Sequence, residues 1–161
     1  MIVILHNIRS LYNVGSIFRT ADAAGVKKLY LCGITPAPVD IFGKPRQQLT
    51  KVSLGAERYV EWDVSARSSR ATLKLLENLK KQGFKIFAIE QSKKSTPYYK
   101  LQTKNLKQKT ALILGNEVNG LPPSILKRAD KILEIPMKGR KESLNVSVAF
   151  GIVIFHLNLV K

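Results

Sequence analysis

Short apolar runs alternate with amphipathic stretches along the whole chain. The runs are bounded by Gly, Pro or polar residues and predict strands at 1–6, 27–33, near 57–62, 84–89, 110–115 and 131–135. The stretches between them have helical periodicity and predict helices at 13–24, 66–82, 122–129 and 144–160. Strands that alternate with helices are typical of a mostly parallel sheet covered on both faces. We therefore expect a single α/β domain.

Capping residues and periodicity agree with the first predicted helix. Asn13 can cap its start and Gly25 can end it. The helical period turns one set of residues toward the core, namely Ile17, Ala21 and Ala24, and places another set on a second side, namely Gly15, Arg19 and Asp22. Arg19 then projects where a ligand can reach it, or it forms a surface ion pair with Asp22 three residues later.

The last predicted helix has two apolar faces. One contains Val148, Ile152, Phe155 and Leu159, and the other contains Val146, Phe150, Val153, Leu157 and Val160. The segment is too short and too polar for a membrane span, so we expect a buried helix. One face can cover the sheet, and the same helix of a second copy can cover the other across a two-fold axis. The pattern therefore predicts a homodimer.

Length and charge restrict the class of protein. The 161 residues suit one domain with its own core. The chain has 27 Lys and Arg against 11 Asp and Glu, a net charge of +16. Such one-sided charge favours a polyanionic partner, with nucleic acid ahead of an anionic membrane surface. The apolar start, Met1–His6, lacks the features of a signal peptide and reads as a first strand.

Several kinds of chemistry are excluded by the residues present. The one cysteine, Cys32, lies in an apolar run, which excludes a disulfide framework and indicates a buried thiol in a cytoplasmic protein. No metal-ligand spacing, paired carboxylates or phosphate-binding glycine loop is present, and His6 and His156 are expected in the core or an interface. What remains is an enzyme that acts by positioning its substrates.

Two long loops are candidates for contact with a polyanion. Residues 34–48 contain three prolines, which disfavour regular structure, and carry Lys44 and Arg46. Residues 91–109 are rich in lysine and contain Tyr98 and Tyr99, a mixture suited to phosphates and stacked bases. The second loop is equally compatible with a solvated linker.

Two segments join a strand to a polar turn. The strand in Ala111–Leu121 stops at a Gly-Asn-Glu turn, and a basic loop in Ile135–Phe150 leads directly into the last helix. Ligands of open α/β sheets bind at the carboxyl ends of strands, so both segments are candidates for one pocket. Asn116, Glu117 and Asn145 also suit turn or capping roles, which are compatible with such a pocket.

Three segments in this order, Asn7–Gly25, Leu112–Leu121 and Ile135–Gly151, resemble the three motifs of the TrmH (SpoU) family of the SPOUT superfamily. The motif-one, motif-two and motif-three segments together cover about a third of the chain. The resemblance implies an α/β fold with a C-terminal deep trefoil knot. It also implies methylation of a ribose 2′-oxygen in tRNA or rRNA, with S-adenosylmethionine as cofactor and no metal.

The resemblance carries roles to individual positions. The expected cofactor-binding residues are Ile89, Glu90, Leu114, Gly115, Asn116, Ile135, Met137, Ser143 and Leu144. Gly115 and Gly139 would let backbone approach the adenosine closely. The expected catalytic residues are Asn13, Arg19, Glu117, Ser143 and Asn145. By resemblance Arg19 matches the residue described as the base. A guanidinium hardly loses its proton, so the alternative is that Arg19 binds the substrate phosphate and stabilises the developing alkoxide.

Residues 1–161 match the catalytic domain without a separate RNA-binding domain, so the domain itself must hold RNA. The expected RNA contacts are Arg9, Lys44, Arg46, Lys138, Arg140 and Lys141. Two alternatives stay open at this point. One is a knotted RNA-binding or ribosome-assembly protein without turnover, and the other is a related enzyme that methylates a base instead of a ribose.

Overall fold

The fold is built on one parallel sheet. The computed structural model describes residues 1–101 and 109–159. Within this part of the chain the strands are β1 (Ile2–His6), β2 (Lys28–Cys32), β3 (Glu61–Asp63), β4 (Lys85–Ile89), β5 (Thr96–Pro97), β6 (Thr110–Leu114) and β7 (Lys131–Glu134). Their order is β3-β2-β1-β6-β4-β7-β5, and every neighbouring pair is parallel. The predicted mostly parallel sheet is confirmed.

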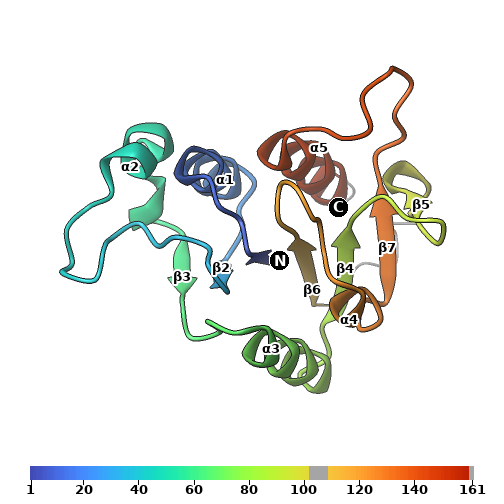
Figure 1. Cartoon of the computed structure of the whole chain (residues 1–161), viewed down its shortest axis with the longest axis horizontal. Helices are drawn as coiled ribbons and strands as arrows, with labels where there is room; N and C mark the ends of the chain where they lie inside the picture. Colours follow the sequence, from blue (N-terminus) through green and yellow to red (C-terminus); the bar gives the residue numbers. More distant parts are fainter. Residues whose placement is uncertain (102–108, 160–161) are drawn as a thin grey trace.

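Helices cover both faces of this sheet (Figure 1). On one face lie α1 (Leu11–Ala23), α2 (Gln47–Ser53) and α5 (Val146–Leu159), and on the other lie α3 (Ser69–Lys81) and α4 (Pro123–Leu126). Alternate residues of β1 face opposite layers, since Val3 and Leu5 belong to one hydrophobic cluster and Ile2 and Ile4 to another. The chain therefore has two cores, one on each side of the sheet.

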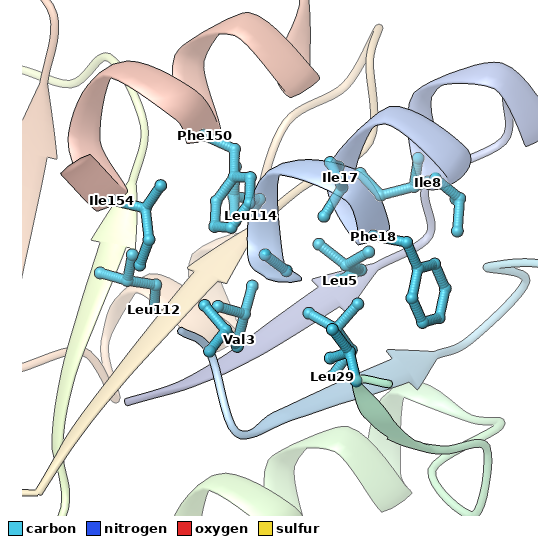
Figure 2. Close-up of a cluster of buried hydrophobic side chains, with 14 of the residues drawn as sticks. Val3, Leu5, Ile8, Ile17, Phe18, Leu29, Leu112, Leu114, Phe150 and Ile154 are labelled. Atoms are coloured by element: carbon cyan, nitrogen blue, oxygen red, sulfur yellow. The ribbon is translucent and has the colours of Figure 1, made fainter. Parts of the chain in front are cut away.

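The larger core lies under α1 and α5. Figure 2 shows Val3 and Leu5 of β1, with Leu112 and Leu114 of β6, below side chains of the two helices. The helical side chains that meet them are fully buried and include Ile17, Phe18, Phe150 and Ile154. This packing fixes the starts of α1 and α5 above the carboxyl ends of the central strands.

The first helix differs from expectation at its start and on one side. Its cap is Ser10, whose hydroxyl accepts from the backbone N–H of Asn13, so the prediction of Asn13 as the cap was wrong. Gly25, at φ +66°, follows its end as predicted. Gly15 is buried instead of sharing an exposed side with Arg19, because a Cβ there would lie 2.5 Å from the Leu49 carbonyl oxygen of α2.

Several short elements also differ from the predicted ones. Helix α2 was not expected, and the region predicted as a strand near 57–62 is a 3₁₀ turn at Ala56–Arg58 followed by the short β3. Strand β5 and a 3₁₀ turn at Tyr98–Lys100 lie within the predicted 91–109 loop, of which 102–108 fall outside the described residues. Helix α4 ends at Leu126, three residues earlier than predicted.

The last helix is buried on one side. Phe150, Val153 and Leu157 are buried as expected, together with Ile154. On the other predicted face Val148 and Phe155 remain 49% and 42% exposed. The Leu159 side chain and Val160, which completed the two predicted faces, lie outside the described residues. None of the helices among the described residues is long and apolar enough to cross a membrane.

Candidate functional site

The carboxyl ends of β1, β6, β4 and β7 share one edge of the sheet, because all four strands are parallel neighbours. The segments that follow these strands surround a cavity of about 330 Å³ at that edge. The start of α5 closes one side of it through Val146 and Ala149. The cavity thus forms where a parallel α/β sheet is expected to bind a ligand.

The structure brings the expected cofactor-binding residues together. All nine line this single cavity: Ile89, Glu90, Leu114, Gly115, Asn116, Ile135, Met137, Ser143 and Leu144. Four of the five expected catalytic residues line it as well: Asn13, Glu117, Ser143 and Asn145. The fifth, Arg19, is exposed on α1 and is not among the lining residues, and within the described residues it forms no ion pair with Asp22.

Glu117 ties the motif-two turn to the start of α1. Its carboxylate accepts hydrogen bonds from the backbone N–H groups of Arg9 and Ser10, each at 3.0 Å, and from the side-chain amide of Asn13, also at 3.0 Å. Burial alone would raise the pKa of Glu117, but these hydrogen bonds outweigh it and lower the pKa below its ordinary value. Glu117 is therefore ionised at neutral pH, and each of its two oxygens already accepts at least one N–H group of the motif-one segment.

Asn13 also reaches the motif-three segment. Its side-chain oxygen accepts a hydrogen bond of 3.0 Å from the amide of Asn145. The oxygen of Asn145 in turn accepts from the backbone N–H of Ser147 at 2.8 Å, which caps α5 as expected. A continuous chain of hydrogen bonds, Glu117–Asn13–Asn145, therefore joins all three motif segments at one wall of the cavity.

Asn116 shapes the motif-two turn. Its side-chain oxygen accepts from the backbone N–H groups of Val118 and Asn119 at 2.9 and 3.0 Å, the pattern of an Asx turn. Its amide donates to the backbone carbonyl of Asn7 at 2.8 Å. The predicted turn role of Asn116 is confirmed, and the turn is anchored to the end of β1.

Gly115, at the start of this turn, is required by the close packing of the turn itself. A Cβ on Gly115 would lie 2.4 Å from the backbone carbon of Gly120, so the two sides of the turn can close only because no side chain is present. By contrast, a Cβ on Gly139 would meet no atom of the described residues within 4 Å. Both glycines were expected to make room for a ligand. In the structure Gly115 makes room for the backbone of Gly120 instead.

Glu90 holds the far end of the same turn. Its carboxylate accepts from the backbone N–H of Leu121 at 2.8 Å and from its neighbour Gln91 at 3.0 Å. Gly120, at φ +62°, leaves space for this carboxylate, because a Cβ there would lie 2.2 Å from Glu90 Oε2. Two carboxylates, Glu90 and Glu117, thus fix the turn from opposite ends.

Sequence reasoning missed a buried network beneath the site. The imidazole of His6 lies 3.3 Å from the Thr72 hydroxyl of α3 and 3.2 Å from the side-chain amide of Asn7. The Asn7 oxygen accepts from the Ile34 N–H, so its amide nitrogen donates to His6 Nε2 and the imidazole proton sits on Nδ1. Asn7 has a left-handed backbone, φ 59°, and this network supports that turn at the end of β1.

Burial shifts two pKa values near this network. It lowers the pKa of His6, which is only 1% exposed and is neutral at neutral pH. It also raises the pKa of the buried Cys32 thiol to about 12. The buried positions predicted for His6 and Cys32 are confirmed. His156 is half-buried and stacks edge-on against Tyr98, with ring centroids 5.0 Å apart.

The expected RNA-binding cations lie outside the cavity. Lys138, Arg140 and Lys141 are exposed on the loop between β7 and α5. Arg9 is exposed at the rim of a second cavity, of about 630 Å³, which shares Asn116 and Gly120 with the first. Lys44 and Arg46 lie on the loop that leads from β2 to α2.

The side chains of the first cavity can position a bound small molecule. Its polar side chains are amides, a hydroxyl and three carboxylates, of which Glu90 and Glu117 accept backbone N–H groups and Glu134 accepts the Ser95 hydroxyl. Apolar side chains such as Ile89 and Leu114 form the remaining wall. Such a cavity suits a small molecule that has both apolar and polar parts.

Comparisons with known proteins agree with this geometry. A tRNA (guanosine(18)-2′-O)-methyltransferase of Aquifex aeolicus is 34% identical over 155 residues, which cover 96% of this chain and 67% of the relative. The 23S rRNA (guanosine-2′-O-)-methyltransferase RlmB of Neisseria meningitidis is 32% identical, over 96% of this chain and 56% of the relative. The chain thus spans about three-fifths of the length of these two relatives.

The fold has close counterparts among solved structures. An AdoMet-bound rRNA methyltransferase from Sinorhizobium meliloti superposes with a TM-score of 0.82 at 28% identity, over 97% of this chain and 54% of that one. The model of the SpoU rRNA Methylase family matches residues 1–155, which include all three motif segments. The chain therefore belongs to the SpoU rRNA Methylase family.

Proposed function

We propose that this protein transfers a methyl group from S-adenosylmethionine to the 2′-oxygen of a ribose in tRNA or rRNA. The observation that carries the proposal is the Glu117–Asn13–Asn145 chain of hydrogen bonds. It holds the three motif segments around one cavity, which the expected cofactor-binding residues line. Relatives named as ribose 2′-O-methyltransferases of tRNA and of 23S rRNA support the same reaction.

The cavity fits the cofactor in size and composition. Its volume of about 330 Å³ lies in the range of small-molecule sites, roughly 300–1,000 Å³. Ile89, Leu114 and Ile135 offer an apolar wall, and the turn at 115–121 offers backbone groups. When bound, S-adenosylmethionine supplies the activated methyl group. The motif-two and motif-three turns would hold it, with Met137 and Leu144 beside it.

The three carboxylates that line this cavity, Glu90, Glu117 and Glu134, already accept hydrogen bonds from protein groups. Glu117 is ionised, but its oxygens already accept hydrogen bonds from three N–H groups, two of the backbone and one of a side chain. We therefore assign Glu117, Asn13 and Asn145 to positioning, and Ser143 to contact with the reacting groups. Arg19 remains cationic and would stabilise the developing negative charge on the ribose oxygen or bind the adjoining phosphate.

We infer that Arg19 serves the cavity of a second copy of the chain. It lies six residues after Asn13, about 9 Å along the helix and about 120° around it, so the two side chains leave α1 in different directions. Asn13 faces the cavity of its own chain, whereas Arg19 is exposed. We propose a homodimer in which α1 and the exposed side of α5, with Val148 and Phe155, meet the partner. Arg19 then serves the partner's cavity.

A C-terminal trefoil knot is the finer fold proposal. Strand β7 lies two places from β6, next to β4, yet α5 returns to pack beside α1 near the middle of the sheet. In Figure 1 the chain leaves β7, extends outward and comes back across the strand ends to α5. This return past the 115–121 turn is the path that a threaded chain requires, and it supports the knot that the family resemblance implies.

The RNA class stays tRNA or rRNA, because the two relatives differ in substrate and are longer than this chain. A net charge of +16 supports RNA binding through phosphates. We place the reaction in the cytoplasm, which the buried thiol of Cys32 supports.

The test is transfer of labelled methyl from S-adenosylmethionine to unmodified tRNA and, separately, to rRNA, followed by digestion to nucleosides. Arg19→Ala should lose transfer while its cofactor affinity, measured by calorimetry, stays near that of the wild type. Lys74→Ala is the matched control, because it removes an exposed cation from α3 on the opposite face of the sheet.

A labelled 2′-O-methyl nucleoside from one RNA class supports the proposal and identifies that class. A labelled base would mean that a base is methylated instead. RNA binding without cofactor binding or transfer would favour the inactive RNA-binding protein. Loss of cofactor binding in Arg19→Ala would contradict the role given to Arg19.

A further inference from the structure

The loop between β2 and α2 contains a closed hairpin at Pro38–Arg46. Val39 and Pro45 form an antiparallel bridge, and the backbone N–H of Arg46 donates to the Pro38 carbonyl at 2.8 Å. The Asp40 carboxylate accepts from the N–H groups of Phe42 and Lys44, at 2.8 and 2.9 Å. The loop that three prolines predicted to be irregular thus has a tip fixed by its own hydrogen bonds.

The tip of this hairpin presents two apolar side chains to solvent. Ile41 is 89% exposed and Phe42 is 79% exposed. Asp40 and Gly43, at φ +77°, already provide the turn, so the turn itself does not require apolar residues between them. An adjacent exposed aliphatic and aromatic pair on a rigid tip is typical of a contact surface.

The charges beside the tip select the kind of partner. Lys44 is exposed, and Arg46 is held in place by a hydrogen bond of 3.4 Å from its Nε to the Val39 carbonyl. Asp40, the acidic residue of the hairpin, uses its carboxylate to accept hydrogen bonds from the backbone N–H groups of Phe42 and Lys44. An aromatic ring flanked by cations matches a polyanion that carries flat apolar groups, which is single-stranded nucleic acid. In a duplex the faces of the bases are stacked on one another and out of reach.

The position of the hairpin is consistent with such a partner. The chain leaves β2 at Cys32, and β2 is parallel to β1, so the hairpin starts from the same edge of the sheet as the cavity. Figure 1 shows the loop reaching outward beyond α2, clear of the two cores. An RNA that approaches the strand ends can therefore extend onto it.

We propose that the Pro38–Arg46 hairpin is a stacking site for an unpaired base of RNA. Phe42 is the platform, Ile41 lies beside it, and Lys44 and Arg46 meet the adjoining phosphates. The identification of the nucleic acid as the substrate RNA rests on the proposed function, whereas the stacking itself can be measured without methyl transfer.

The experiment measures binding of a fluorescent single-stranded RNA and of the matching duplex by anisotropy. Phe42→Ala should weaken single-strand binding about tenfold or more and leave duplex binding within about twofold. Phe42→Leu keeps an apolar side chain without a ring and should weaken it similarly, whereas Phe42→Trp should retain affinity. Cofactor affinity and melting temperature should stay unchanged in all three variants.

A second readout uses the only tryptophan, Trp62. In a Trp62→Phe background, Phe42→Trp places the one indole at the hairpin tip, and stacking on a base should quench its fluorescence. Wild-type affinity in Phe42→Leu, or an equal loss for duplex and single strand in Phe42→Ala, would overturn the stacking site. A change from dimer to monomer in Phe42→Ala would assign the tip to a contact between copies instead. If these binding results hold but no RNA accepts methyl, the proposed function fails and the stacking site stands.

Discussion

The Asn13 amide donates a 3.0 Å hydrogen bond to the Glu117 carboxylate, across 104 residues of sequence. The same carboxylate accepts the N–H groups of Arg9 and Ser10, so one acid orients both the motif-one turn and the start of α1. Asn13 passes this orientation on to Asn145 at the start of α5. The three motif segments therefore behave as one positioning unit.

Glu117→Gln should separate this positioning from binding. An amide replaces one acceptor oxygen by a donor, which opposes the N–H groups of Arg9, Ser10 or Asn13. A displacement of about 1 Å at a reacting centre lowers rates on the order of 100-fold. We expect a fall of that size in kcat, with a smaller change in RNA affinity. Glu142→Gln is the control, because Glu142 is exposed, has the same charge and is not among the residues that line the cavity. Equal kcat values for the two variants would show that Glu117 does not position the reacting groups.

The glycines of the motif loops should differ sharply in their tolerance of a methyl group. Gly115→Ala and Gly120→Ala place a Cβ against backbone and against Glu90, and Gly120 also has a positive φ. We expect each to lower the free energy of unfolding by about 1–3 kcal/mol and to weaken cofactor binding. Gly139→Ala should be neutral, because in the part of the chain that the structure describes no atom lies within 4 Å of its added Cβ. Urea unfolding and calorimetry measure both effects, and a neutral Gly115→Ala would contradict the close contact across the turn.

The sequence predicted the sheet well because its buried strands are continuous apolar runs. It missed α2, in which only Leu49 and Ser53 are buried, so that helix has almost no apolar period to detect. It could not predict β5, which is two residues long and includes Pro97. The prediction of Asn13 as the helix cap was wrong because Ser10, three residues earlier, can cap a helix equally well.

The candidate cavity was predictable because its residues belong to turns after neighbouring parallel strands. The supporting contacts were not, since they join residues far apart in the chain. His6 and Thr72 are 66 positions apart, and nothing in either local pattern indicates that they meet. The helical period correctly predicted that Arg19 is exposed. It could not predict that Arg19 is absent from the cavity lining, because that depends on how α1 packs against other elements.

His6 should make the stability of the protein depend on pH. Burial lowers its pKa below the ordinary 6.5, so the unfolded chain takes up a proton before the folded one does. The free energy of unfolding should therefore decrease as pH falls from 6.5 toward the folded pKa and level off below it. His6→Gln should remove that part of the pH dependence. Urea unfolding from pH 5 to 8 checks this, and an identical slope in wild type and variant would contradict it.

The α5 surface provides a direct test of the dimer. Phe155→Lys introduces a charge where a partner would bury a side chain that is 42% exposed in the single chain. We expect a monomer by light scattering, with little change in melting temperature. Ile41→Lys is the control, because it places the same charge on a more exposed apolar position away from α5 and should remain dimeric. A dimeric Phe155→Lys would move the interface elsewhere.

Mixing two inactive variants should reveal which chain supplies Arg19. Arg19→Ala and Glu117→Gln each damage every site of their own dimers. If Arg19 serves the partner, a mixed dimer has one site with an intact Glu117 and an intact Arg19 from the other chain. Random exchange makes about half of the dimers mixed, so about a quarter of wild-type transfer should return after unfolding and refolding the two variants together. If Arg19 serves its own chain, no site in any dimer is intact, and refolding the mixture restores no transfer.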